Sequence, residues 1–358
     1  MPKVNGITNG DSESELDRKD SKSGPRLYVF SAKSQKSVLG LVENAKVWVE
    51  AHSQASQLCA LSKTLLIRRT PFQWRTAVVA STTEDLLTKL GHSVRATKES
   101  HTRLSMVFSG QGAQWYAMGR ELIFTQSKFR VSILKSDALL QDLGASWNLI
   151  EVLSQNEKES IIDRSDVSQP ACTALQIALV DLLESLDIRP EDVVGHSSGE
   201  MAAAYAAGAL THKAAITAAY YRGFTANAVN TILQTTGAMI AVGLNESAVL
   251  PFIEQLTSGK AVVACVNSPK SVTVSGDSQA IDELKDILSS QQDPIFNRKL
   301  RVDTAYHSHH MAVVAKRYLE SMAGLEYCDT KKGVNFFSSV SGELKQTGFG
   351  PQYVSFHS

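Results

Sequence analysis

The stretch VVGHSSGEMAAAYAA, residues 193–207, decides the fold. Its two valines predict a short buried strand, and the alanine-rich run from about Glu200 to Ala207 predicts a helix. Between them Gly195-His196-Ser197-Ser198-Gly199 matches G-x-S-x-G, the pattern of a sharp strand-to-helix turn that exposes a serine hydroxyl. The spacing selects Ser197, and not Ser198, as a nucleophile. The alternative is an ordinary glycine-rich turn that opens a helix.

A serine nucleophile needs donors for an oxyanion and a base for its proton. The backbone N–H of Ser198, at the start of the predicted helix, points to where an oxyanion develops. Three histidines, His307, His309 and His310, follow in one short run, and spacing alone does not choose between them. No acidic residue is clearly placed as a third member. A backbone carbonyl would then orient the imidazole.

The rest of the chain alternates strands and helices. A strand over 104–108 leads into the turn Ser109-Gly110-Gln111-Gly112. Ser168 is expected to cap the helix that precedes the central strand, with Pro170 just inside it. From 239 to 304 the order is strand, helix, strand, strand, helix and a last strand at Leu300–Val302, which is the ferredoxin-like arrangement.

These patterns predict an α/β protein with several parts. A disordered linker over 1–26 precedes a small α/β linker module over 27–98. A large α/β-hydrolase-like body spans 99–230 and 305–340, and the ferredoxin-like subdomain over 231–304 is inserted into it. An irregular tail over 341–358 follows the final strand, expected at Val334–Val340.

Composition narrows the function classes. Lys+Arg and Asp+Glu are equal at 36 each, so no charge excess favours nucleic acid or an anionic membrane. The four cysteines form no CxxC pair, which argues against a disulfide scaffold or a structural metal site. The sequence has no apolar run of membrane-spanning length and no secretory signal, which favours the cytoplasm by default.

Four motifs together resemble one family. Phe108-Ser109-Gly110-Gln111-Gly112-Ala113-Gln114 resembles the GQGxQ signature of malonyl-coenzyme A:acyl-carrier-protein transacylases, and Gly195 to Glu200 resembles their GHSxGE elbow. Tyr221-Arg222-Gly223 resembles their arginine motif, and Val302 to Met311 their histidine motif. The pattern is similar to acyltransferase domains of fungal-type iterative polyketide synthases, whose ketosynthase–acyltransferase linker module resembles residues 27–98.

The resemblance implies a role for each matching residue. Ser197 would carry the acyl group, and His307 would move the proton. Arg222 would pair with the free carboxylate of a malonyl group, as a planar guanidinium does. Backbone N–H groups of Gln111 and Ser198 would form the oxyanion hole. A main-chain carbonyl of the loop at Ser338-Ser339 would hold the other imidazole nitrogen.

The pocket residues follow the same resemblance. His196 would shape the pocket, with a structural role as the alternative, whereas His309 and His310 are assigned to structure. Tyr306 precedes the histidine of the motif, and a bulky aromatic there accompanies malonyl use in related enzymes. The ring would fill the space that a branching methyl group needs.

The implied function is transfer of a malonyl group from malonyl-CoA to the phosphopantetheine thiol of an acyl carrier protein. The expected partners are that carrier and a neighbouring ketosynthase, with coenzyme A thioester as substrate, no bound cofactor and no metal. One alternative is a serine esterase that shares only the elbow, although a neutral ester needs no carboxylate clamp. Another is an inactive fragment, because the family continues beyond Gly350-Pro351-Gln352-Tyr353 and the chain is expected to be truncated.

Overall fold

The computed structural model describes residues 24–92, 96–98, 103–300, 302 and 304–355. The chain forms two compact units, Met1–Thr102 and Arg103–Ser358, and each is described here by itself. The linker predicted over 1–26 lies outside the described residues except for its last three. Within the described residues, no helix has both the length and the apolar character needed to cross a bilayer.

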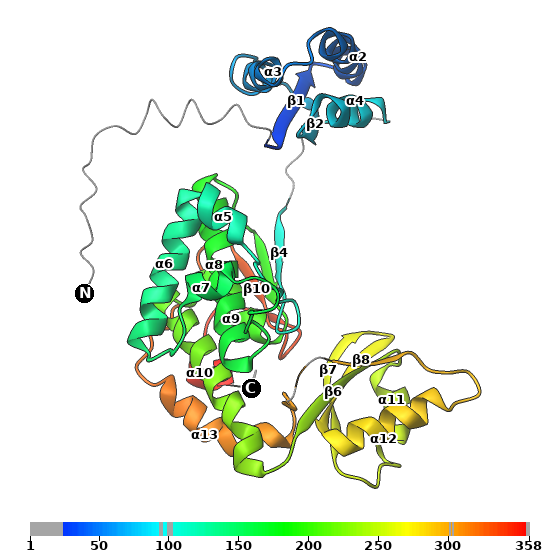
Figure 1. The fold of residues 1–358 in the computed structure, drawn as a ribbon, viewed down its shortest axis with the longest axis vertical. Coiled ribbons are helices and arrows are strands. Elements are labelled where there is room, and N and C mark those ends of the chain that lie inside the picture. The colour runs from blue at the N-terminus through cyan, green and yellow to red at the C-terminus, as the bar shows by residue number, and fades with distance from the viewer. Residues whose placement is uncertain (1–23, 93–95, 99–102, 301, 303, 356–358) are drawn as a thin grey trace. The chain divides into compact units, whose positions relative to one another are not determined.

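The first unit is built on a three-stranded antiparallel sheet (Figure 1). Strands β1 (Arg26–Ala32), β2 (Trp74–Ala80) and β3 (Thr97–Lys98) lie side by side in that order. Helices α2 (Gln35–Ala51), α3 (Ala55–Ile67) and α4 (Thr83–Gly91) pack against β1 and β2. The alternation of apolar residues in β1 and the helical spacing of Val38, Val42, Ala45 and Val49 in α2 bury one common core.

The second unit contains a large subdomain with a four-stranded sheet in the order β11-β10-β5-β4. Strands β4 (Ser105–Phe108), β5 (Asp192–Gly195) and β10 (Asn335–Phe337) are parallel, and β11 (Leu344–Lys345) is antiparallel to β10. The carboxyl ends of parallel strands meet at one edge, which is where open α/β sheets place their sites. The turn at Gly110–Gln111, the elbow at Ser197 and the loop at Ser338 therefore converge there.

Helices cover this sheet and carry further site residues (Figure 1). They are α5 (Arg120–Thr125), α6 (Ser127–Asp142), α7 (Leu149–Ser154), α8 (Ser165–Ser185), α9 (Glu200–Ala207), α10 (His212–Leu233) and α13 (Ala312–Ser321). The expected cap at Ser168 is wrong, because α8 begins at Ser165 and holds Pro170 inside it. The first turns of α8 are buried against α10, where a Cβ on Gly223 would lie 2.4 Å from the carbonyl oxygen of Ser165.

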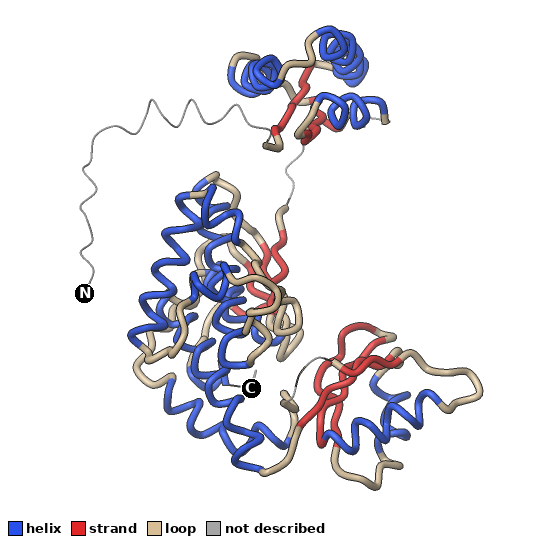
Figure 2. Tube along the Cα trace, viewed as in Figure 1, coloured by secondary structure: helices blue, strands red, loops and turns tan. Residues whose placement is uncertain are grey.

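The small subdomain has the ferredoxin-like fold predicted from the sequence. Its order is β6 (Gly237–Val242), α11 (Glu246–Ile253), β7 (Ala261–Ser268), β8 (Ser271–Asp277), α12 (Ser278–Ser289) and β9 (Asn297–Lys299). The strands form an antiparallel sheet in the order β7-β8-β6-β9, and Figure 2 shows both helices on the same side of it. Val272 and Val274 face these helices, so Thr273 between them faces the opposite side.

Three segments differ from the sequence predictions. The final strand, expected at Val334–Val340, is β10 at Asn335–Phe337, because the chain turns after it and the Gly342 N–H donates to the Ser338 carbonyl over 2.9 Å. The last small-subdomain strand is Asn297–Lys299 and not 300–302, because Leu300 and Val302 pack against a separate apolar cluster around Tyr306 and Met311. The tail over 341–358 is not irregular where it is described, since it contains β11 and the short helix α14 (Pro351–Ser355). Phe349 is buried there and packs edge-on against Phe336.

Candidate active site

Ser197 lies at the turn between β5 and α9, in a left-handed backbone conformation with φ of 51°. This conformation costs a non-glycine residue about 1–2 kcal/mol, so surrounding contacts must hold it. Both motif glycines allow that close packing. A Cβ on Gly195 would lie 2.3 Å from the backbone nitrogen of Glu200, and one on Gly199 would lie 2.2 Å from the carbonyl oxygen of Phe108.

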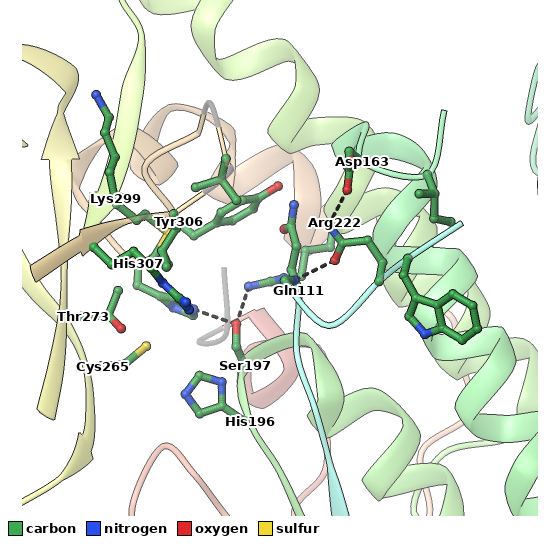
Figure 3. A pocket seen from close by; sticks show the side chains of 18 of the residues that line it. Gln111, Asp163, His196, Ser197, Arg222, Cys265, Thr273, Lys299, Tyr306 and His307 are labelled. Atoms are coloured by element: carbon green, nitrogen blue, oxygen red, sulfur yellow. Dashed lines mark hydrogen bonds between the residues drawn. The ribbon is translucent and has the colours of Figure 1, made fainter. Parts of the chain in front are cut away.

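His307 comes from the segment that returns from the small subdomain, and it too has a positive φ, of 58°. Its Nε2 lies 2.8 Å from Ser197 Oγ, as the dashed line in Figure 3 marks. His309 and His310 point elsewhere, since the Nε2 atoms of both lie within hydrogen-bond distance of Asp277 Oδ1. The geometry therefore selects His307 among the three candidate bases.

Arg222 projects from α10 to the same hydroxyl, and only 1% of the residue is exposed. Its Nη2 donates to Ser197 Oγ over 3.2 Å, and its Nη1 donates to Gln169 Oε1 over 2.5 Å. The guanidinium also lies over the Tyr306 ring, 5.2 Å from the ring centre. Burial lowers the pKa of Arg222 from its ordinary value, but a guanidinium remains protonated in proteins. A permanent positive charge thus lies beside the serine.

Gln169 was missed by sequence reasoning. It lies in α8, is fully buried, and donates from Nε2 to the Tyr306 hydroxyl over 3.0 Å while accepting from Arg222. Its only sign in the sequence is a long polar side chain in the first half of α8, where the other buried residues are small or apolar. Tyr306 is itself buried, and burial raises the pKa of its phenol. Gln169 therefore fixes the relative positions of Arg222 and Tyr306.

Gln111 and Ser198 are neighbours because β4 and β5 are parallel and adjacent. The backbone N–H of Gln111 donates to Ser198 Oγ over 3.0 Å, and the His196 N–H donates to the Phe108 carbonyl over 2.8 Å. The two predicted oxyanion donors are thus brought to the same edge of the sheet as Ser197. The Ser198 side chain, which is buried, holds the Gln111 turn in place.

His196 is exposed and reaches across to the small subdomain. Its Nε2 lies 3.0 Å from Asn267 Oδ1 on β7, and Asn267 Nδ2 donates to Thr273 Oγ1 on β8 over 2.9 Å. The residue before the serine therefore contacts the inserted sheet.

A second buried network, which the sequence patterns did not predict, lies behind the elbow. Glu200, 3% exposed, accepts from the backbone N–H of Ser339 over 2.6 Å and from the Tyr353 hydroxyl over 2.9 Å. The Tyr353 hydroxyl also lies 2.7 Å from Ser338 Oγ. The α14 helix thereby holds the loop at Ser338-Ser339 against the first residue of α9.

Ser197, His307 and Arg222 line a cleft of about 860 Å³ between the two subdomains of the second unit. Figure 3 shows Ser197, His307 and Arg222 converging at its floor. The wall from the large subdomain includes Gln111, Trp115, Tyr116, Asp163 and Tyr306, and the wall from the small subdomain includes Cys265, Thr273, Arg298 and Lys299. A serine–histidine pair next to a buried guanidinium can transfer an acyl group that carries a negative charge.

Two parts of the chain match families of known protein domains. Residues 105–350 match the family of acyl transferase domains, and residues 26–90 match a family described as CurL-like, PKS C-terminal. The chain is 45% identical over 351 residues to the highly reducing polyketide synthase ltbA of Aspergillus luteorubrus, covering 98% of this chain and 11% of that protein. It is 45% identical over 336 residues to sdnO of Sordaria araneosa, covering 90% of this chain and 11% of that protein.

Solved structures share the fold as well. The acyltransferase domain from module 8 of the salinomycin polyketide synthase superposes with a TM-score of 0.78 at 27% identity, covering 93% of this chain and 79% of that one. The acyl transferase domain of ZmaA gives 0.79 at 26% identity, covering 94% and 78%. The chain thus spans about a tenth of the length of the curated relatives it matches and most of the length of solved single domains. This chain is an acyltransferase that belongs to the acyl transferase domain family of polyketide synthases.

Proposed function

We propose that the chain transfers a malonyl group from malonyl-CoA to the phosphopantetheine thiol of an acyl carrier protein, through an acyl-enzyme on Ser197. The observation that carries the proposal is Arg222, a buried cation whose Nη2 lies 3.2 Å from the Ser197 hydroxyl. A malonyl thioester has its free carboxylate one carbon away from the reacting carbonyl. A guanidinium beside the nucleophile therefore suits an acyl group with that charge at that position.

The first half-reaction forms the acyl-enzyme. Ser197 Oγ attacks the thioester carbonyl carbon while its proton moves to His307 Nε2, which lies 2.8 Å away. The tetrahedral intermediate then breaks its carbon–sulfur bond. The departing coenzyme A sulfur takes the proton from His307, so free coenzyme A leaves and malonyl-Ser197 remains.

The second half-reaction repeats these steps with a different thiol. The phosphopantetheine thiol of the carrier gives its proton to His307 and attacks the ester carbonyl. The carbon–oxygen bond to Ser197 breaks, and the serine oxygen recovers the proton from His307. The chemistry needs no oxidant and no bound cofactor, and coenzyme A takes part only as the substrate thioester.

The backbone N–H groups of Gln111 and Ser198 would stabilise the negative oxygen of each tetrahedral intermediate. The Gln111 N–H donates to Ser198 Oγ, so it must exchange that acceptor for the developing oxyanion. We assign His196, which is held by Asn267, to the substrate side of the cleft.

Tyr306 supports a preference for malonyl over methylmalonyl units. Its ring is 3% exposed, lies under the Arg222 guanidinium and is held by Gln169. A ring fixed there fills space beside the carboxylate site, where a branching methyl group would lie. One methyl group in a tight pocket is worth about 1–3 kcal/mol of discrimination.

The similarity to highly reducing polyketide synthases supports a setting in polyketide biosynthesis, beside a ketosynthase and a carrier protein. The rival functions are a serine hydrolase, in which water replaces the carrier thiol, and an inactive fragment. Incubating the chain with malonyl-CoA and a phosphopantetheinylated carrier protein distinguishes the three. We expect malonyl-carrier to form faster than free malonate. Faster release of malonate indicates a hydrolase, and neither product indicates an inactive chain.

A further inference from the structure

Asp277 lies at the joint between the two subdomains, at the last residue of β8. Its Oδ2 accepts from the backbone N–H of Lys260 over 2.7 Å, and its own N–H donates to the Lys260 carbonyl over 2.9 Å. The next N–H, of Ser278, donates to the Thr236 carbonyl in the segment that enters the small subdomain. The carboxylate is therefore held rigidly by backbone on one side, which leaves Oδ1 directed to the other.

Oδ1 contacts the segment that carries His307. His310 Nε2 lies 2.6 Å from Oδ1, and His309 Nε2 lies 3.2 Å from it. His310 is 1% exposed and belongs to the 3₁₀ turn His309–Met311, which begins two residues after His307. The contact thus joins the small subdomain to the base through a single turn of chain.

His307 needs such support because its backbone is strained. Its φ of 58° lies in the left-handed region, which a non-glycine residue occupies only where its surroundings hold it. The Ser308 hydroxyl donates to the Ala305 carbonyl over 2.7 Å and accepts from the His310 N–H over 3.2 Å. These bonds tie the turn to itself, whereas the Asp277 contact ties it to the small subdomain.

We propose that the Asp277–His310 hydrogen bond is a latch that sets the position of His307 relative to Ser197. Asp277 and His310 are positioning residues, since neither touches the reacting atoms. Acyl transfer depends on a near-attack geometry, and a displacement of about 1 Å can cost about a hundredfold in rate. This inference rests on the proposed acyl transfer.

Asp277, His309 and His310 together also resemble a zinc site. They are residue types that bind zinc, and their donor atoms all lie within 4.8 Å of one another. The His310 ring argues against that reading. Its Nδ1 is buried, and the described residues offer it no hydrogen-bond partner. A metal on Nε2 would place the ring proton on Nδ1, where metal-bound histidines normally have an acceptor. In the metal-free arrangement the proton is on Nε2 and is donated to Asp277. Nδ1 is then an acceptor without a donor among the described residues, and the ring has no buried N–H without an acceptor.

The test compares two adjacent histidines in the full chain. We expect His310→Ala to lower the rate constant of Ser197 acylation by malonyl-CoA at least about tenfold, with KM changed less than about threefold. His309→Ala, at the exposed and longer contact, should stay within about twofold of the unaltered chain. Rapid-quench measurement separates positioning from misfolding. Positioning slows the burst at full amplitude, whereas a merely structural role lowers the amplitude and leaves its rate constant unchanged.

Further variants keep the test decisive if His310→Ala folds poorly. His310→Gln places an amide donor where Nε2 lies, so we expect it to recover most of the rate. Asp277→Ala should lose at least as much as His310→Ala, because it also removes the contacts with Lys260 and His309. The double variant should lose no more than Asp277→Ala, because both changes break the Asp277–His310 hydrogen bond. The latch would be overturned if His310→Ala and Asp277→Ala both acylated Ser197 as fast as the unaltered chain. It would also be overturned if the losses of the two single variants added up in the double variant. A rise in Tm with Zn²⁺ that disappears in His309→Ala would overturn it as well.

A fluorophosphonate probe keeps this inference separate from the proposed substrate. The probe reacts with an activated serine and needs no carboxylate clamp. If the unaltered chain reacts with the probe but not with malonyl-CoA, the proposed substrate is wrong. The latch then still predicts slower labelling in His310→Ala than in His309→Ala.

Discussion

The nucleophile and the base reach the same point of the cleft in two different ways. Ser197 is held by close backbone packing, because the glycines at 195 and 199 let the turn lie against β4 and the start of α9. His307 is 110 residues further along, and its turn is tied to the fold through Asp277 of the inserted subdomain. Both residues have a positive φ, of 51° and 58°.

The two residues therefore depend on different kinds of contact for their strained backbones. The strain at Ser197 is held by backbone packing of the turn against β4 and α9 within the large subdomain. The strain at His307 is held by side-chain hydrogen bonds across a joint between subdomains. We therefore expect perturbations of the Asp277 contact to act on catalysis through the base and to leave the backbone of the Ser197 turn unchanged.

The largest expected effect comes from removing the base itself. His307→Ala should lower acyl transfer about 10⁴-fold or more, because losing one member of a serine–histidine unit can cost about 10⁶-fold. Steady-state transfer from malonyl-CoA to a carrier protein measures it, with His309→Ala as the matched control. Comparable losses in the two variants would remove the distinction between His307 and its neighbour.

The elbow around Ser197 could be predicted from the sequence, because the residues that form it are adjacent in the chain. The alanine-rich run predicted a helix over Glu200–Ala207, and α9 has those bounds. The order of the inserted subdomain followed from the alternation of apolar residues, and the structure confirms it. Ser197 was selected by spacing within five residues.

The base side could not be predicted from pattern alone, because its determinants are contacts between distant segments. Three histidines share one run, and spacing alone does not choose between them. The family resemblance pointed to His307, and it is His307 whose Nε2 lies 2.8 Å from Ser197 Oγ. No sequence pattern predicted the contacts of Gln169, Glu200 and Asp277, because each forms a hydrogen bond with a residue more than 30 positions away. Leu300–Val302 looked like a strand because it is apolar, but its side chains pack in another cluster.

The pH dependence of stability should report on the packed core of the large subdomain. His212, 5% exposed at the start of α10, has its pKa lowered to about 4 by burial, with a contribution from Lys135. The unfolded chain binds the proton near pH 6.5, so stability should rise with pH between about 4 and 6.5. We expect a loss on the order of 3 kcal/mol at pH 4 relative to pH 7.

Urea unfolding at each pH measures this loss, and His212→Gln isolates it from other titrating groups. The variant should show a smaller decrease in the free energy of unfolding as the pH falls. If His212→Gln has the same pH profile as the unaltered chain, His212 does not cause the loss of stability. The buried ring, whose Nε2 lies 2.8 Å from Ser136 Oγ, would then take up a proton in the folded state as easily as in the unfolded chain.

The arginine should affect one substrate class more than another. Arg222→Ala should lower kcat/KM for malonyl-CoA roughly a hundredfold, since each charge-assisted hydrogen bond is worth about 1.5–3 kcal/mol. Transfer of an acetyl group from acetyl-CoA should fall much less, which also controls for misfolding. Equal losses for both thioesters would show that Arg222 acts only by holding Gln169 and Tyr306 in place.

The smallest expected effect concerns side-chain choice on the acyl group. Tyr306→Ser should shift the ratio of methylmalonyl to malonyl transfer upward by about tenfold, because removing the ring opens space for one methyl group. Tyr306→Phe keeps the ring and loses the Gln169 contact, so it should retain the malonyl preference. Competition between the two thioesters measures both. An unaltered chain that favours methylmalonyl-CoA would contradict the steric argument.

The most direct test of the account is intact-protein mass spectrometry after brief incubation with malonyl-CoA. The chain should gain the mass of one malonyl group, located on the peptide that contains Ser197. Ser198→Ala should still be acylated, although more slowly because its hydroxyl holds the Gln111 turn. Ser197→Ala should show no such gain. Acylation that persists in Ser197→Ala, or that maps to another residue, would contradict the assignment of Ser197 as the nucleophile.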